Sequence, residues 1–354
     1  MLYEAKAWKE NEGPSLRNFD KQKQIDSVNG ALALRPQIES VIDKIWEEGF
    51  DGIYFIGIGG TYASAMQVEV YMRGRSNLPV FVENAAEFLT TGNKRFTKNS
   101  VVIYSSVSGN TKEMVQLVDR VHEIGARVFA FIDTPGTTLT QPDKQEYLIM
   151  YPMNEQLKFY MVANYLMYKN GEFEDYDRYN KEMEAHLADV LAQVEIDSDA
   201  WAYEYAKNKV AFLQDHKDLP HYFIGSGNQY GATYSYAMCY WEEQMWIRTK
   251  SISCQEFFHG MQEIIVADTP VTLFMGEDEQ RPLAERVARF LPKVNANYTI
   301  IDTKEHELAG ISPEFRGSIS HLVMHGVNNR VDAYMELFLR HPLSIRRYYR
   351  QFEY

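Results

Sequence analysis

The stretch Tyr54-Phe55-Ile56-Gly57 returns 168 residues later as Tyr222-Phe223-Ile224-Gly225. Two more pairs of apolar stretches follow in the same order, at offsets of 170 and 169 residues: Val101-Val102-Ile103-Tyr104 with Val271-Thr272-Leu273-Phe274, and Ile132-Asp133-Thr134 with Ile301-Asp302-Thr303. One short match can arise by chance, but three in order at nearly one offset indicate an internal duplication. The sequence therefore predicts one domain that is built twice.

Strand-like and helix-like segments alternate within each copy. In the first copy, short apolar runs rich in β-branched and aromatic residues are typical of buried parallel strands, and they cover residues 52–56, 79–82, 101–104 and 128–132. Helix-length segments at 64–73 and 111–124 separate them, and the second carries apolar residues at helical spacing. This alternation predicts an α/β fold, with a three-layer α/β/α sandwich and a mainly parallel sheet in each half.

The same patterns predict the domain boundaries. We expect the first domain at residues 30–170, a helical linker at 171–208, the second domain at 209–340 and a C-terminal tail at 341–354. The linker follows from a region, 154–208, that has many helix formers and no clear strand pattern. In the second copy, a helix is expected from about residue 232 to residue 248.

Composition excludes several classes of protein. The 354 residues are 45% hydrophobic and 24% charged, which suits a packed core, and the net charge of −13 does not suit binding to a nucleic-acid backbone. No apolar run approaches the ~20 residues of a membrane helix, and the N-terminus does not resemble a signal peptide. The two cysteines, Cys239 and Cys254, lack metal-ligand spacing, so we expect neither a metal site nor a disulfide, and a cytoplasmic location.

The loop after the third expected strand is the strongest candidate for ligand binding. Residues 105–111 read Ser-Ser-Val-Ser-Gly-Asn-Thr, with four hydroxyls, one amide and one glycine directly before a helix. Hydroxyls, backbone N–H groups and the helix dipole together suit a phosphate dianion. Simple capping of the helix by Ser108 or Asn110 is the alternative, but it would need one such residue, and the surplus favours phosphate.

The glycine loop after the first expected strand is weaker evidence. It reads Gly57-x-Gly59 and has Tyr62 where a dinucleotide fingerprint has its third glycine. Glu83, after the next strand, would then be the ribose-binding acid, so a dinucleotide site stays an open alternative.

The second copy has diverged from the first. Its loop at 275–279 carries three acidic residues, which would repel a phosphate, so this half must contribute something else. Glu243 and His259 lie 16 residues apart, and a carboxylate with an imidazole suits proton transfer at a sugar carbon and oxygen. From the residues alone, a surface glutamate and a structural loop histidine are the better explanation of this pair.

Several segments resemble the SIS (sugar isomerase) domain family in its tandem form, over roughly residues 30 to 354. The form includes the isomerase half of glucosamine-6-phosphate synthase and the deglycases of phosphorylated fructose–amino acids. Four stretches carry the resemblance: Gly59-Gly60-Thr61-Tyr62, Ser106-Val107-Ser108-Gly109-Asn110-Thr111, Pro135-Gly136-Thr137-Thr138-Leu139, and Glu256-Phe257-Phe258-His259-Gly260, which Met261 follows where proline is usual.

The resemblance implies a role for each matching residue. It places the sugar phosphate on Thr61, Ser106, Ser108 and Thr111, with further substrate contacts from Gly60, Ser105, Asn110 and Glu256. It makes Glu243 the general base, with its neighbour Glu242 as the alternative. It makes His259 the group that assists ring opening, supplied by the other subunit of a homodimer.

Two departures from the synthase narrow the expected activity. No cysteine amidotransferase domain precedes the duplicated part, so glutamine-dependent synthesis is not expected. The tail lacks the synthase lysine and resembles the Arg-Arg-Tyr-Tyr ending of the deglycases, which suggests that Arg347 or Tyr349 contacts the amino-acid part of the substrate. A helix end with surface arginines is the plain alternative.

The resemblance therefore implies a cofactor-free deglycase of 6-phosphorylated sugar–amine conjugates, of the fructoselysine 6-phosphate or glucoselysine 6-phosphate type. Such an enzyme releases a hexose 6-phosphate and a free amine. A phosphosugar aldose–ketose isomerase, a glucosamine-6-phosphate deaminase and a non-catalytic sugar-phosphate sensor remain alternatives.

Overall fold

The computed structural model describes residues 12–349, 351 and 352, and the chain folds into two compact units. The first unit comprises Ile25–Ala188 with Gly310–Ser318, and the second comprises residues 12–24, Asp189–Ala309 and the described residues from Ile319 onward. The division along the main chain falls inside the expected linker, which is helical. That linker contains α7 (Tyr176–Glu182), π-helical η2 (Met183–Leu187) and the start of α8 (Ala188–Asp215).

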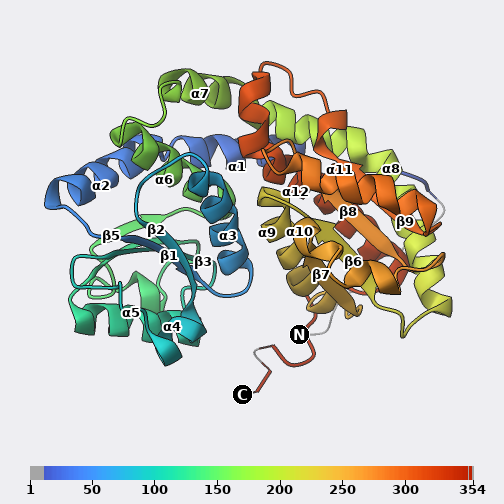
Figure 1. Ribbon diagram of the computed structural model, residues 1–354, viewed down its shortest axis with the longest axis horizontal. Helices are drawn as coiled ribbons and strands as arrows, with labels where there is room; N and C mark the ends of the chain where they lie inside the picture. The colour runs from blue at the N-terminus through green and yellow to red at the C-terminus, as the bar shows by residue number, and fades with distance from the viewer. Residues whose placement is uncertain (1–11, 350, 353–354) are drawn as a thin grey trace. The chain divides into compact units, whose positions relative to one another are not determined.

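The first unit holds five parallel strands in the order β2-β1-β3-β4-β5 (Figure 1). Its elements are α1 (Lys21–Leu32, beginning in the other unit), α2 (Arg35–Glu48), β1 (Ile53–Gly57), α3 (Gly60–Arg73), β2 (Val80–Asn84), α4 (Ala85–Thr91), β3 (Val101–Ser106), α5 (Lys112–Ile124), β4 (Arg127–Ile132), η1 (Thr138–Thr140), β5 (Tyr147–Met150) and α6 (Glu155–Lys169).

Alternation along the strands of the first unit distributes its core over both faces of the sheet. Tyr54 and Ile56 pack with the buried side chains of α4 and α5. Phe55, between them in sequence, points to the opposite face and meets Phe159 of α6 with ring centroids 5.3 Å apart. Successive strand residues face opposite sides of the sheet, and each side packs against helices. This confirms the predicted three-layer sandwich in the first unit.

The second unit holds four parallel strands in the order β7-β6-β8-β9. Its elements are the main part of α8, β6 (His221–Gly225), α9 (Asn228–Ser235), η3 (Tyr236–Glu242), β7 (Thr249–Ser253), α10 (Cys254–Phe257), η4 (Met261–Ile264), β8 (Val271–Met275), α11 (Arg281–Phe290), η5 (Leu291–Lys293), β9 (Tyr298–Asp302), η6 (Thr303–Glu305) and α12 (Pro313–Leu339, beginning in the other unit). The repeated stretches occupy β1 and β6, β3 and β8, and the ends of β4 and β9, which confirms the duplication.

The core of the second unit follows the same rule. Ile224 and Leu273 pack with α10 and α11 on one face. Phe223 faces the other side, where its ring centroid lies 4.9 Å from that of the fully buried Trp241. Trp241 belongs to η3, a π-helical continuation of α9, so this helix is fixed to the sheet just before it ends.

Two local expectations need correction. Strand β5 was not predicted, because its four residues form a short edge strand with one fully buried side chain and no clear alternation. The helix expected to reach residue 248 ends at Glu242, since Trp246 takes a positive φ of 60° and the Ile247 N–H turns back to the Trp241 carbonyl at 2.9 Å.

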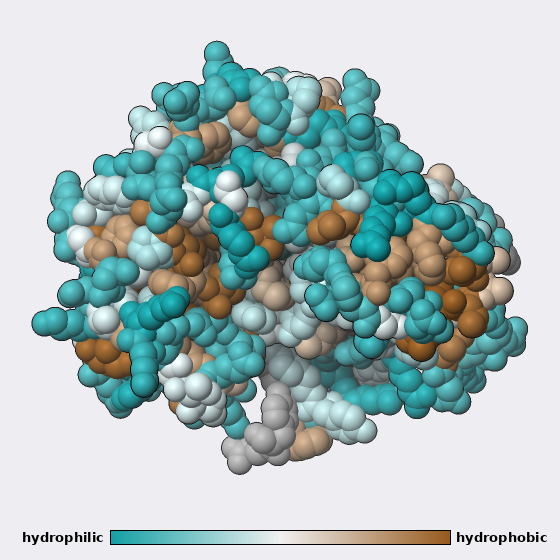
Figure 2. All heavy atoms as spheres, in the orientation of Figure 1, coloured by the Kyte–Doolittle hydropathy of each residue, from teal (hydrophilic) through white to brown (hydrophobic). Residues whose placement is uncertain are grey.

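The surface drawn in Figure 2 is mainly hydrophilic, and its hydrophobic residues form separate patches. None of the helices in the described part of the chain combines the length and the apolar composition that crossing a bilayer requires.

Candidate functional site

The serine-rich loop lies where β3 passes into α5, and a neighbouring turn fixes its shape. Gly109 has φ of +61°, and a Cβ atom there would lie 2.0 Å from Thr137 Oγ1. The Thr138 N–H donates to Asn110 Oδ1 at 2.9 Å, and the Leu139 N–H donates to the Gly109 carbonyl at 2.9 Å. The glycine is required here because the Pro-Gly-Thr turn packs directly on the loop.

The hydroxyls of this loop are not used to cap α5. Thr111 occupies the N-cap position and makes no side-chain capping hydrogen bond. Ser108 Oγ accepts from the Asn110 N–H at 3.3 Å and lies 3.4 Å from Thr111 Oγ1, while Ser106 Oγ accepts from the Gly109 N–H at 3.1 Å. Helix capping by Ser108 or Asn110 is therefore not what the structure shows, and the first turn of α5 has no side-chain cap to exclude an anion.

The glycine loop before α3 holds itself closed through one threonine. Thr61 Oγ1 donates to the Ile58 carbonyl at 3.0 Å and lies 3.1 Å from the Ile58 amide nitrogen, which donates to it. A Cβ atom on Gly57 would lie 2.6 Å from the Thr61 carbonyl carbon, so glycine permits this close packing. The space beside Gly59, at φ of +61°, is open. Gly60 begins α3, and a phosphate contact by Thr61 stays a prediction.

Two residues that sequence reasoning missed lie at the same edge of the sheet. Glu155, at the start of α6, has its pKa raised by burial, although the nearby hydroxyls of Ser64 and Ser105 oppose the shift. Lys158 is fully buried, and its Nζ donates to Asp133 Oδ1 at 3.2 Å and to the Tyr151 carbonyl at 2.8 Å. In the sequence, the sign of these two residues was an acidic and a basic side chain one turn apart at the start of an otherwise apolar helix.

The N-terminus of α9 in the second unit corresponds to the N-terminus of α3 in the first, and a side chain of the protein fills it. The Asn228 N–H, at the first turn of α9, donates to Asp278 Oδ2 at 2.7 Å. A Cβ atom on Gly227 would lie 2.0 Å from the same oxygen, and the Gly227 N–H donates to Gln280 Oε1 at 3.1 Å. The acidic loop at 275–279, interpreted from sequence as repelling phosphate, thus places one carboxylate over the helix N-terminus.

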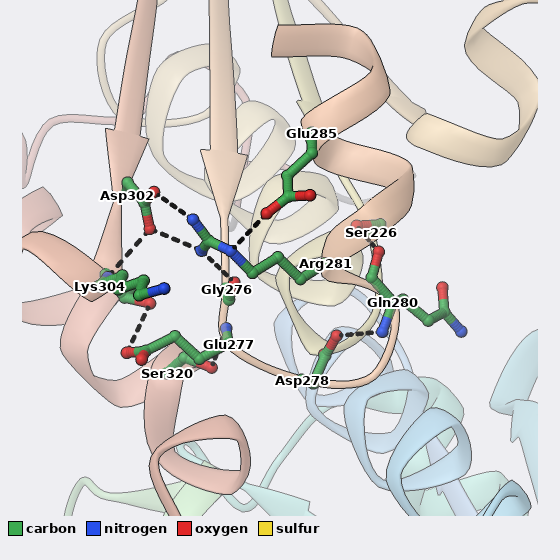
Figure 3. A network of polar contacts seen from close by, with 11 residues as sticks. Ser226, Gly276, Glu277, Asp278, Gln280, Arg281, Glu285, Asp302, Lys304 and Ser320 are labelled. Atoms are coloured by element: carbon green, nitrogen blue, oxygen red, sulfur yellow. Dashed lines mark hydrogen bonds and ion pairs between the residues drawn. The ribbon is translucent and has the colours of Figure 1, made fainter. Parts of the chain in front are cut away.

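Figure 3 shows how this acidic loop is held in place. Arg281 donates to both carboxylate oxygens of Asp302, at 2.8 and 2.6 Å, and to the Gly276 carbonyl at 2.9 Å. Gln280 donates its N–H to Asp278 Oδ1 at 3.0 Å. These bonds fix the loop on both sides of Asp278, so its carboxylate is a built part of the second unit.

Glu243 lies in a cleft of about 750 Å³ in the second unit. Its half-buried carboxylate accepts from Arg346 Nε at 2.7 Å. The alternative base, Glu242, is exposed and accepts from Thr249 Oγ1 at 2.6 Å. The cleft is lined by Asp218, Pro220, Glu242, Glu243, Trp246, Ile247, Arg248, Thr249, Arg346, Arg347, Tyr348 and Tyr349.

The second unit places Glu243 and His259 at opposite ends of β7. The cleft residues Pro220 and Thr249 stand at the starts of β6 and β7, whereas His259 is exposed in a turn after the far end of β7. The five residues of β7 between them span on the order of 16 Å. Glu256, also exposed, lies beside His259 and away from the cleft. The unit therefore does not join the predicted base and histidine in one site.

Two tail residues predicted to contact substrate line the same cleft as Glu243. The Arg347 guanidinium lies over the Trp246 ring, 4.1 Å from its centroid. Tyr349 is exposed at the rim of the cleft. Within residues 12–349, 351 and 352, no group of three or more His, Cys, Asp or Glu side chains is arranged to hold a metal ion.

Comparisons with known proteins agree with this architecture. Residues 50–168 match the SIS domain family model. The fructosamine deglycase FrlB of Bacillus subtilis (strain 168) is 27% identical over 322 residues, which cover 90% of this chain and 97% of the relative. The isomerizing glutamine–fructose-6-phosphate aminotransferase of Clostridium acetobutylicum is 24% identical over 290 residues, covering 80% of this chain and 45% of that enzyme.

Solved structures with the same fold span nearly the whole chain. A candidate phosphosugar isomerase from Bacillus subtilis has a TM-score of 0.78 at 25% identity, covering 94% of this chain and 100% of its own. Another from Salmonella typhimurium has a TM-score of 0.81 at 23% identity, covering 90% of this chain and 99% of its own. Residues 50–168 therefore form an SIS domain, and the second half of the chain builds a parallel sheet with the corresponding strand order, as in these solved structures of the same fold.

Proposed function

We propose that this chain is a deglycase of 6-phosphorylated sugar–amine conjugates, such as fructoselysine 6-phosphate or glucoselysine 6-phosphate. The observation that carries the proposal is the serine-rich loop at the start of α5, where no side chain caps the helix. A helix N-terminus beneath several hydroxyls suits a sugar phosphate. The similarity to a fructosamine deglycase along 90% of the chain supports the conjugate as substrate.

The phosphate group anchors the substrate on the first unit, through Ser106, Ser108 and Thr111, with Thr61 and the helix N–H groups beside them. Two hydrogen-bonded hydroxyls 3.4 Å apart, on Ser108 and Thr111, offer adjacent donors to one dianion. Charge-assisted bonds of this kind are among the stronger hydrogen bonds in proteins. Gly60, Ser105 and Asn110 complete this side of the site.

Proton transfer then breaks the carbon–nitrogen bond of the conjugate. For a fructoselysine-type conjugate, His259 assists opening of the sugar ring, which exposes the C2 carbonyl. Glu243 removes a proton from C1, giving an enolamine, and reprotonation at C2 yields an aldose imine. Water adds to the imine carbon, and the free amine leaves as hexose 6-phosphate forms. The sequence of steps moves protons and consumes one water, so it needs no redox cofactor.

The active enzyme in this proposal is a homodimer in which His259 comes from the other subunit. The separation of Glu243 and His259 by the length of β7 supports this arrangement, because one chain's second unit does not bring them together. The amino-acid part of the conjugate would lie in the Glu243 cleft against Arg347 and Tyr349.

The test is an assay of 6-phosphorylated glycated amino acids for release of glucose 6-phosphate, with fructose 6-phosphate, tagatose 6-phosphate and glucosamine 6-phosphate run in parallel. The proposal expects release from at least one conjugate at a kcat/KM at least 100-fold above any of the simple phosphosugars. Interconversion or deamination of a simple phosphosugar as the dominant activity would replace it with an isomerase or deaminase. Binding without turnover on every compound would identify a sensor.

A further inference from the structure

The tail residue Arg346 holds the Glu243 carboxylate through a contact that the mechanism above does not use. Arg346 Nε lies 2.7 Å from Glu243 Oε1, and the two side chains are 20% and 34% exposed. The same guanidinium is tied to its own turn, since Nη1 donates to the carbonyls of Leu343 at 2.5 Å and Ile345 at 3.1 Å. The turn closes through the Ile345 N–H and the Pro342 carbonyl at 3.2 Å.

This arrangement fixes the direction in which Nε–H points. A guanidinium is planar, so two backbone bonds to one end set the orientation of the other end. A glutamate side chain has several free torsions, and ordering it costs conformational entropy. The bond to Arg346 orders the Glu243 side chain in the folded protein, so the carboxylate is held in one position in the cleft before substrate arrives.

Other charged groups in the cleft have partners of their own. Glu242 is bonded to Thr249, Asp218 pairs with Arg248, and Arg347 lies over Trp246. His341 contributes Nε2 to a hydrogen bond with the Gln244 carbonyl at 2.9 Å. The titratable and charged groups that face Glu243 from its own turn, from the segments before β6 and β7, and from the tail are Asp218, Glu242, Arg248, His341, Arg346, Arg347, Tyr348 and Tyr349.

We propose that Arg346 is a positioning residue for the reaction: it orients the Glu243 carboxylate, so that the folded turn at 342–346 completes the base. The inference rests on the proposed function, because it assigns Glu243 the role of base. Without the guanidinium, the same carboxylate samples more orientations.

The test compares the steady-state kinetics of Arg346→Met and Arg346→Lys with those of wild type on the conjugate. Arg346→Met should lower kcat about 30-fold and change KM for the conjugate less than 3-fold, because the base loses its orientation while the substrate keeps its binding site. Arg346→Lys keeps the charge but not the planar fork, so kcat should still fall about 10-fold. A wild-type kcat in Arg346→Lys would contradict orientation by the planar guanidinium.

Arg289→Met is the matched control, because it removes an equal charge from an exposed position on α11, outside the cleft. Its kcat should stay within 2-fold of wild type. Turnover of Arg346→Met within 2-fold of wild type, or an equal loss of kcat in both Met variants, would overturn the inference.

A carbon-13 NMR spectrum keeps this result separate from the proposed function. In protein labelled at glutamate carboxyls, the Glu243 signal is the one that Glu243→Gln removes. Arg346→Met should change the chemical shift of that signal, whichever reaction the enzyme catalyses, because the carboxylate loses the partner that fixes it. An unchanged signal contradicts the Arg346 proposal, whereas wild type that releases no hexose 6-phosphate from any conjugate contradicts only the deglycase.

Discussion

The backbone N–H of Asn228 donates to the Asp278 carboxylate at 2.7 Å, so an acidic side chain of the protein occupies the N-terminus of α9. The matching glycines, Gly227 and Gly59, have nearly equal φ of +60° and +61°. Beside Gly59, however, the space is open, whereas beside Gly227 it is filled by Asp278. The two copies have kept one loop geometry, and in the second an internal carboxylate fills the space that is open in the first.

Replacing Asp278 with alanine should therefore destabilise the second unit and uncover an anion site. Loss of a capping carboxylate at α9 costs about 1 kcal/mol. Inorganic sulfate should restore part of the lost stability, because the freed N–H groups of α9 then donate hydrogen bonds to an external anion. Thermal unfolding with and without 50 mM sulfate measures the effect, and the increase in Tm should be larger for Asp278→Ala than for wild type. Asp218→Ala, at an exposed carboxylate, is the control; equal increases in all three proteins would contradict the prediction.

Removing the hydroxyls of Ser108 and Thr111 together should weaken binding of phosphorylated substrates selectively. Each hydrogen bond to a charged group contributes about 1.5–3 kcal/mol, so KM should rise by at least about 100-fold when both are lost. Steady-state kinetics on a conjugate with its phosphate and on the same conjugate without it measure the selectivity. The non-phosphorylated conjugate should lose less than 3-fold, and an equal loss on both would remove this loop from the phosphate site.

The duplication and the positions of most strands along the chain could be predicted because they rest on buried, β-branched runs such as those of β1 and β6, whose pattern is local. The position of Glu243 relative to Arg346 could not be predicted from the sequence, because an ion pair between residues 103 positions apart depends on where the tail folds. Asp278 shows a third case. Its charge was visible in the sequence, but only the fold shows that the carboxylate points at Gly227.

Mixing two inactive variants should restore activity if His259 acts across the dimer. Glu243→Gln and His259→Ala homodimers should each lack turnover. In a mixed dimer, one of the two shared sites contains both wild-type residues, so random exchange of subunits gives about a quarter of wild-type activity. The measurement is turnover after co-refolding or co-expression of the two variants. A mixture that stays inactive while mixed dimers form would place both residues in one chain's site.

A second variant pair decides which glutamate of the cleft is the base. Glu242→Gln leaves the Glu243–Arg346 contact untouched and should keep turnover within about 3-fold of wild type, since only a bond to Thr249 changes. Glu243→Gln should abolish turnover and leave binding of hexose 6-phosphate, measured by calorimetry, within 3-fold. The reverse pattern would make Glu242 the base.

The Asp332 carboxyl should make the second unit less stable as pH rises toward neutrality. Tyr236 donates its O–H to Asp332 Oδ1 at 2.8 Å, but burial raises the pKa of Asp332 from 3.8 to about 7, despite this opposing bond. Between these values the native chain keeps a proton that the unfolded chain has released, so the stability from this group is complete below about pH 4 and is lost as pH passes 7.

Asp332→Asn keeps an acceptor for Tyr236 and cannot ionise. The free energy of unfolding of the variant minus that of wild type, from urea unfolding, should rise by about 2.5 kcal/mol from pH 5 to pH 7.5. Asp268→Asn, at an exposed position, controls for the loss of any carboxylate. A difference that does not change with pH would mean that Asp332 ionises in the folded chain as readily as in the unfolded one.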